Sequence, residues 1–140
     1  MYQKDYILRM AEMVARLLAG LLGLINKKEY TRASEQLSTM YHDILKEDAS
    51  FFRSIPEAEL THELLEKHNY TNGHLEILAE LFYAEAELEY AQGMKMDSLE
   101  FTKKSLMLFE FVDREMKTYS ADRIEKMEAL RRRIEELQNL

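Results

Sequence analysis

The sequence predicts an all-α protein, and three observations support this fold class. Gly occurs four times and Pro once in 140 residues, too rarely for the turns of a sandwich or barrel. The good helix formers Leu, Glu, Lys, Met and Ala dominate the composition. Apolar residues recur at three- and four-residue steps along most of the chain, which is the period of one helical face. We therefore expect residues 1–140 to form one domain of about six helices.

The first helix is expected from about Lys4 to Asn26. Its apolar residues form one face, and they are Ile7, Met10, Val14, Leu17, Leu18, Leu21 and Ile25. Leu22 lies off this stripe, and Gly20 and Gly23 would allow another backbone to approach closely. The second half of the helix should therefore pack on more than one side.

The nine apolar residues 17–25 do not predict a membrane span, because a span needs about 20 such residues. They also run into Asn26, Lys27 and Lys28 without the small residues of a signal-peptide cleavage site. We interpret the segment as a buried helix and expect no membrane partner.

A second helix should follow the polar residues 26–29. Its stripe consists of Tyr30, Ala33, Leu37, Met40, Tyr41, Ile44 and Leu45. Because the connection is so short, the first two helices should form an antiparallel hairpin.

A third, short helix is expected to begin near Ser54 and end near Lys67. Ser54 is a good N-cap residue, Pro56 suits a first helical turn, and Glu57 completes the spacing of a capping box.

The fourth and fifth helices should form a second hairpin. Asn72 is the predicted cap of a helix over residues 74–92, and Gly93 is a natural stop. Asp97 and Glu100 have the spacing of a capping box for the next helix. The inner residues of that fifth helix are Leu99, Thr102, Leu106, Phe109, Val112 and Met116.

Ser120 should cap a sixth helix with a narrow apolar stripe and otherwise charged faces. The stripe consists of Ile124, Met127, Leu130, Ile134 and Leu137. This helix and the first one both have more apolar surface than one partner covers. We therefore expect a homodimer, formed through Leu22 or through Ile134 and Leu137.

The two hairpins resemble each other, and together they resemble tetratricopeptide repeats. Aligning Ala33 with Ser98 gives an offset of 65 residues, close to two repeats of about 34 residues. Lys28 stands where the repeat has its turn Gly, and Thr102 and Ser105 are more polar than the pattern. The resemblance implies antiparallel tetratricopeptide-like hairpins in a helical-repeat-like domain.

Nearly the whole chain also resembles a family of small uncharacterised bacterial proteins with tetratricopeptide-like hairpins. The resemblance rests on residues 1–10, 30–37, 52–54 and 90–93. It implies a cytoplasmic bacterial protein and a helical-repeat fold, and it assigns no activity to any residue.

The charge and the cysteine count exclude several classes of protein. A net charge of −7 disfavours nucleic acid and anionic membranes as partners, because both attract basic surfaces. The absence of Cys excludes disulfides and thiol nucleophiles, and it fits a reducing compartment such as the cytoplasm.

The only metal-type spacing is Glu59-x-x-His62, which places a carboxylate and an imidazole on one helix face. A di-metal site needs a second such pair, and His42, His68 and His74 lie outside this motif. We expect no metal or other cofactor. The chain also has no phosphate-binding loop and no nucleophile motif, so we expect no enzymatic activity.

The fourth helix is strongly acidic, with no Lys or Arg between residues 75 and 94. Its acidic residues are Glu76, Glu80, Glu85, Glu87 and Glu89. Neighbouring bases, for example Lys103, Lys104 and Arg114, could neutralise it. Alternatively, it lines a groove for a basic or polar peptide. The residues expected on that partner surface are Glu76, Glu80, Tyr83 and Glu87.

Two functions remain open from the sequence. The first is a non-catalytic helical-repeat scaffold that binds a protein or peptide partner. The alternative is a small-molecule or metal-binding helical bundle, in which Glu59, His62, His42 and His74 would converge on one point.

Overall fold

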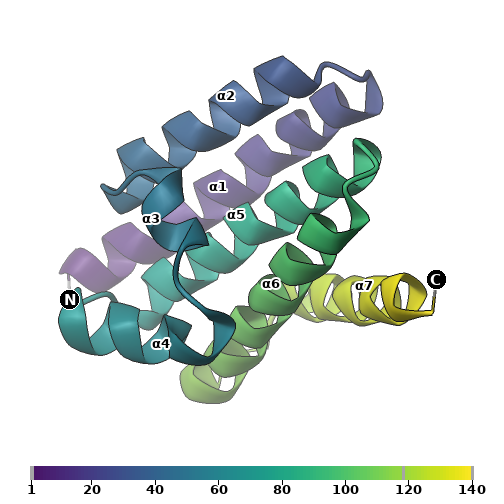
Figure 1. Cartoon of the computed structure of the whole chain (residues 1–140). Helices are drawn as coiled ribbons and strands as arrows, with labels where there is room; N and C mark the ends of the chain where they lie inside the picture. Colours follow the sequence, from purple (N-terminus) through teal and green to yellow (C-terminus); the bar gives the residue numbers. More distant parts are fainter. Residues whose placement is uncertain (1, 118, 140) are drawn as a thin grey trace.

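The all-α prediction is confirmed. The computed structural model describes residues 2–117 and 119–139, and all their regular elements are helical (Figure 1). The α-helices are α1 (Tyr2–Asn26), α2 (Tyr30–Met40), α3 (Ala49–Arg53), α4 (Leu60–His62), α5 (Asn72–Ala91), α6 (Lys95–Met116) and α7 (Ala121–Gln138). Short irregular turns adjoin them: the π-helical turns η1 (Tyr41–Leu45) and η3 (Glu63–Lys67) and the 3₁₀ turn η2 (Glu57–Glu59).

The central element is α5, which packs against α1, α2 and α6. In Figure 1, α1 and α5 run side by side in the same direction, and α2 and α6 return antiparallel to them. α7 packs on α6 and runs across toward the right of the view. The two predicted hairpins are therefore present, and α3 and α4 lie in the connection between them.

The core follows the predicted stripes closely. Completely buried side chains of the two hairpins include Val14, Leu37, Tyr41, Leu75, Leu78, Phe82 and Phe109. α5 is buried almost all round, because α1, α2, α6 and the turn η1 pack against it. Burying an aliphatic or aromatic side chain contributes about 1.5 to 3 kcal/mol, so these residues dominate the stability of the fold.

Small polar residues of α6 allow it to pack closely on α5. The Ser98 hydroxyl donates to the Ala86 carbonyl at 2.8 Å, and the Ser105 hydroxyl donates to the Ala79 carbonyl at 2.7 Å. Both hydroxyl groups are buried, and these bonds satisfy them. The departure from the apolar repeat pattern thus has a structural reason.

The turns of the two hairpins have the same backbone geometry. Lys28 has φ 64° and Gly93 has φ 81°, so a left-handed residue ends α1 and α5 alike. The Lys28 amide donates to the Ile25 carbonyl, and the equivalent Gly93 amide donates to the Tyr90 carbonyl. The next bonds are also equivalent, from Glu29 N to Leu24 O and from Met94 N to Glu89 O. Every pair is separated by the 65-residue offset seen in the sequence.

Two expectations for the first helix are wrong. Leu17 is 49% exposed, so it does not belong to the core face. A Cβ atom built on Gly20 or Gly23 would meet nothing within 4 Å, so no other part of the chain approaches them closely. Leu22 is half-buried against the core, whereas the Ile7 side chain lies outside the described residues.

The predicted cap at Ser54 is also wrong. Its hydroxyl donates to the Phe51 carbonyl at 2.8 Å, and Ser54 ends the short helix α3 instead of beginning a helix. Pro56 precedes the turn η2, and the helical segment then continues to Lys67 as predicted.

The remaining caps are partly as predicted. Ser120 caps α7, since its hydroxyl accepts from the Arg123 amide at 3.2 Å. α5 is capped by Thr71 and not by Asn72, and its capping box uses His74. α6 begins at Lys95 without a side-chain cap, so Asp97 lies inside the first turn and caps nothing.

None of the helices in residues 2–117 and 119–139 combines the length and apolar character needed to cross a membrane.

Candidate functional site

The acidic residues of α5 point to two different sides of the molecule. Glu76, Glu80 and Glu87 face α7, where each forms an ion pair. Glu85 and Glu89 instead line a groove that α5 shares with α2 and α6. The two sides have different electrostatics.

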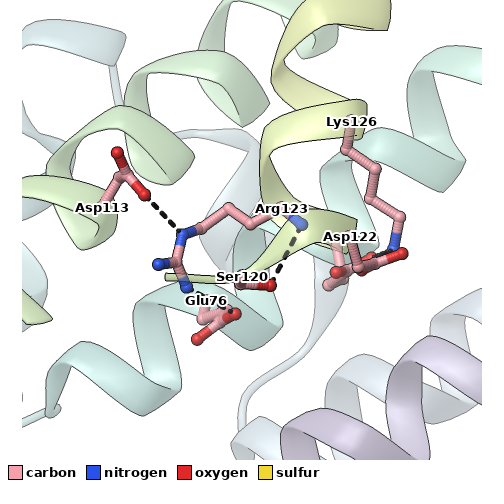
Figure 2. Close-up of polar contacts among 7 residues, drawn as sticks. Glu76, Asp113, Ser120, Asp122, Arg123 and Lys126 are labelled. Atoms are coloured by element: carbon pink, nitrogen blue, oxygen red, sulfur yellow. Dashed lines mark hydrogen bonds and ion pairs between the residues drawn. The ribbon is translucent and has the colours of Figure 1, made fainter. Parts of the chain in front are cut away.

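On the first side, basic residues of α7 neutralise α5. Arg123 Nη1 lies 3.3 Å from a Glu76 oxygen, and Arg123 Nε donates to Asp113 of α6 at 3.1 Å (Figure 2). Lys126 donates to Glu80, and its Nζ also lies 3.1 Å from Asp122. Burial raises the pKa of the Glu80 carboxyl, and the Lys126 ammonium offsets part of that rise.

The rest of the predicted partner surface lies beside the same helix. Arg133 Nη1 lies 3.5 Å from a Glu87 oxygen, and Lys126 Nζ lies 5.8 Å from the centre of the Tyr83 ring. The face predicted from Glu76, Glu80, Tyr83 and Glu87 thus holds the chain's own α7. The bases that neutralise this face are Arg123, Lys126 and Arg133 of α7, and not the expected Lys103, Lys104 and Arg114 of α6.

The second side is an open groove of about 560 Å³ between α2, α5 and α6. Its carboxylates come from three helices, and they are Glu35, Glu85, Glu89, Asp97 and Glu100. Among the described residues that line it, Arg53 of α3 carries the positive charge. We call this feature the acidic groove.

The floor of the acidic groove is an ion pair whose carboxylate is buried. Arg53 Nε donates to a Glu85 oxygen at 3.0 Å, and only 2% of the Glu85 side chain is exposed. The Arg53 side chain is 38% exposed and reaches the groove surface. Burial and the nearby Glu85 carboxylate raise the pKa of Tyr41, which lies completely buried below.

Higher in the acidic groove, two carboxylates repel each other. Burial raises the pKa of Glu89, and the negative charge of Asp97 raises it further. Arg53 only partly offsets this effect. A cation placed in the groove would therefore be attracted by Glu89 and Asp97 together.

The turn between α5 and α6 forms one end of the acidic groove. There the Tyr30 hydroxyl donates to the Ala91 carbonyl at 3.3 Å and ties α2 to α5. Met94 in this turn and Met96 in the first turn of α6 are 51% and 81% exposed.

Sequence reasoning found Glu89 as part of the acidic series but missed Arg53, Asp97 and Glu35 as its neighbours. No signal in the sequence predicted α3, which carries Arg53. Asp97 had instead been assigned to a helix cap.

The residues predicted for self-association lie on two elements. Leu137 is buried within its own chain, and Ile134 and Leu22 are half-buried. Leu22 lines a cavity of about 490 Å³ with residues of α5, α6 and α7. α7 thus buries most of its stripe intramolecularly.

The His and Glu side chains considered for a metal site do not assemble. Glu59 and His62 are exposed on the connecting segment, and His42 is exposed at η1. His74 is used in the α5 cap, where its Nδ1 accepts from the Thr71 amide at 3.0 Å. In the part of the chain that the structure describes, no three His, Asp or Glu side chains are grouped to hold a metal ion.

Comparison with protein-family models, with curated proteins and with solved structures finds no match to this chain.

Proposed function

We propose that this protein is a non-catalytic helical-repeat scaffold that binds a basic segment of a partner protein. The acidic groove carries the proposal. Five carboxylates from three helices line this open groove, and Arg53 is the base among its described lining residues. Arg53 pairs with Glu85 and Lys104 pairs with Glu100, which leaves Glu35, Glu89 and Asp97 in excess.

The repeated turn geometry supports the repeat part of this proposal. Lys28 and Gly93 occupy equivalent positions in two hairpins that pack side by side through α1 and α5. Stacked helical hairpins create extended grooves between them, and such proteins commonly use these grooves to bind peptides. The acidic groove lies between the two hairpins, because its walls come from α2 and α6.

The electrostatics favour a cationic side chain. Glu89 and Asp97 destabilise each other when both are ionised, and a bound Lys or Arg would relieve that repulsion. A partner segment would also exclude water, which strengthens each charge interaction.

We further propose a cytoplasmic location. The absence of Cys from the 140 residues fits a reducing compartment.

The test uses a fluorescent peptide rich in Arg, Lys and Leu, with a matched peptide in which Glu replaces the basic residues. Fluorescence anisotropy measures binding of each peptide to the full chain. We expect the basic peptide to bind, and its affinity to fall several-fold between about 50 mM and about 300 mM salt because of screening. The acidic peptide should not bind.

Two variants locate the binding to the groove. Glu89→Gln and Asp97→Asn should each weaken basic-peptide binding by about fivefold, since each removes one attracting charge. Glu115→Gln removes a charge at an exposed position of α6 outside the groove and should leave the affinity unchanged. Equal losses in all three variants, or equal binding of both peptides, would refute the proposal.

A further inference from the structure

A second apolar stripe runs along the outside of α1. Tyr6 is 58% exposed and Leu17 is 49% exposed. The stripe continues at alternating steps of four and three residues through Tyr6, Met10, Met13, Leu17, Gly20 and Leu24. Met10 and Leu24 are partly buried against the core of their own chain. This average period of 3.5 residues is that of a helix seam that packs against another helix.

The stripe borders an open groove of about 620 Å³ between α1 and α2. Met10, Met13 and Leu17 form its α1 wall, and Met40 and Ile44 lie on the opposite side. We call this feature the outer groove. It lies on a different side of α1 from Leu22, which faces the cavity near α7.

Each residue of the first hairpin has an equivalent 65 positions later in the second hairpin. The equivalents of the outer groove show that such a surface is normally buried. Met10, Met13 and Leu17 of the first hairpin are equivalent to Leu75, Leu78 and Phe82 of the second. Those three residues are completely buried. The opposite wall consists of Glu35, Gln36, Thr39, Met40, Asp43 and Ile44. Five of its six equivalents are also buried, and they are Phe101, Lys104, Ser105, Leu108 and Phe109.

In the second hairpin, the chain itself covers this surface. The Tyr41 ring packs 6.3 Å from the Phe82 ring, and the Lys104 ammonium donates to the Arg53 carbonyl at 3.1 Å. Helical segments between the hairpins thus fill the groove of the second hairpin. The equivalent groove of the first hairpin remains open, so it is a helix-packing surface without a helix on it.

We propose that a second copy of the chain covers the outer groove, with its α1 antiparallel to the first α1 around a two-fold axis. This proposal does not depend on peptide binding in the acidic groove. An isologous contact requires a self-complementary surface, and the α1 stripe has this property.

The self-complementarity follows from the spacing of the stripe. When Met13 of one copy lies opposite Leu17 of the other, Met10 lies opposite Gly20 and Tyr6 lies opposite Leu24. Every residue of the stripe then meets another stripe residue of the second copy. Met10, one of the two Met residues of the inner layers, meets the residue without a side chain.

Gly20 is an independent reason to place a helix there. Gly inside a helix costs roughly 0.5 to 1 kcal/mol relative to Ala. Its backbone conformation is helical and a Cβ would meet nothing within 4 Å, so nothing in the monomer requires Gly at this position. A Met10 side chain of a second copy packed over Gly20 would require it.

The charges beside the stripe agree with the antiparallel arrangement. Glu12 and Arg16 are exposed on the flank of α1. In the proposed register, Arg16 of the second copy reaches the level of residue 14, about 3 Å along the axis from Glu12 at a rise of about 1.5 Å per residue. Each guanidinium therefore lies near the axial level of a carboxylate of the other copy, and Glu12 also borders the pocket beside α5 and α7.

Sedimentation equilibrium tests the contact. The wild type should be mostly dimeric at about 100 µM, as expected for a dissociation constant near 1 µM. Leu17→Glu should give a monomer, and Gly20→Leu should raise the dissociation constant at least about tenfold by colliding with Met10 of the second copy. Ala19→Glu is the matched control, since Ala19 is exposed on another face of α1, and it should remain dimeric.

Cysteine cross-linking tests the register, because the chain has no Cys of its own. Met13→Cys and Leu17→Cys chains mixed and oxidised should form a disulfide with each other, and mass spectrometry identifies the mixed product. Each variant alone should cross-link poorly.

Several results would overturn the proposal. They are a monomeric wild type, species larger than a dimer, and Met13→Cys cross-linking mainly to itself, which indicates parallel helices. Dissociation by Leu22→Glu or Ile134→Glu, with none by Leu17→Glu, would place the contact elsewhere. Circular dichroism of each variant verifies that a monomeric Leu17→Glu is folded.

Discussion

Lys126 of α7 forms an ion pair with Glu80 of α5, and only 4% of the Glu80 side chain is exposed. The carboxylate has lost almost all its contact with water, and burial raises its pKa even in the presence of Lys126. A buried carboxylate needs a partner, because the desolvation cost of an unpaired charge is several kcal/mol. The buried Glu80 carboxylate of α5 requires a base, and α7 supplies it as Lys126. This ion pair therefore helps to attach α7 to α5.

Removing the ammonium should destabilise the protein strongly. We expect Lys126→Met to lower the free energy of unfolding by about 3 kcal/mol, because Glu80 remains buried without its base. The double variant Glu80→Met and Lys126→Met should recover most of this loss. Urea unfolding measures both, and Glu125→Ala, at an exposed position of α7, is the control. A loss no larger than in this control would show that Glu80 is solvated in solution.

Glu89 should make stability depend on pH. Burial and Asp97 raise its pKa in the folded state above the ordinary value of 4.5. Its contribution to stability is therefore fully present below the unfolded pKa and is lost as the pH rises through the folded pKa. Glu89→Gln should melt at a higher temperature than the wild type at pH 7.

The gain in Glu89→Gln should shrink as the pH falls and should vanish near about pH 4, where both states are protonated. Circular dichroism melts at a series of pH values measure it. A constant difference between the two proteins would exclude titration of Glu89 as the cause. A variant that is more stable and yet binds the basic peptide less well would have the signature of a functional residue.

The two core stripes can be tested at their centres. Leu37 of α2 and Phe109 of α6 are both completely buried. We expect Leu37→Ala and Phe109→Ala to cost about 2 to 5 kcal/mol each, because each leaves a cavity. Met96→Ala, at a side chain that is 81% exposed, should cost less than about 0.5 kcal/mol. Similar unfolding midpoints for all three variants would contradict the assigned core.

That the protein binds no metal remains a prediction from the sequence, and a melting experiment can test it. A ligand of the native state raises the melting temperature in proportion to its occupancy. We expect zinc, iron and manganese to leave the melting temperature unchanged. A saturable rise that is lost in His62→Ala would instead support the metal-binding bundle.

The hairpins could be predicted because their signals are local. The apolar steps through Val14, Leu37 and Phe109 place each residue on the inside of its helix, and the structure confirms all three. Gly93 likewise ends α5 with the left-handed backbone that favours Gly. The spacing of apolar residues and the residue types at a turn depend only on neighbours a few positions away. Both can therefore be recognised in a single sequence.

The candidate site could not be predicted in the same way. Glu76 and Glu89 are both acidic residues of α5, yet one faces α7 and the other faces the acidic groove. Which side each occupies depends on where α7 and α3 pack, and α3 has only five residues. Asp97 has the spacing of a cap, but α6 already begins at Lys95, with Met94 at the N-cap position. Asp97 therefore lies within the first turn of the helix. Tertiary packing decided these positions.

The order in which helices pair along the chain has a consequence for how the protein folds. α5 with α6, α6 with α7, and α1 with α2 are neighbours in sequence, whereas α1 with α5 joins distant parts. Local pairs close short loops and form fast, and the distant pair must wait for a longer loop to close. We therefore expect the Ser105 contact with α5 to be formed in the folding transition state, and the packing of Val14 against α5 to follow. The φ-value of each variant, Ser105→Ala and Val14→Ala, is its change in the activation free energy of folding divided by its change in the free energy of unfolding. A higher φ-value at Ser105 than at Val14 would support this order, and the opposite result would reverse it.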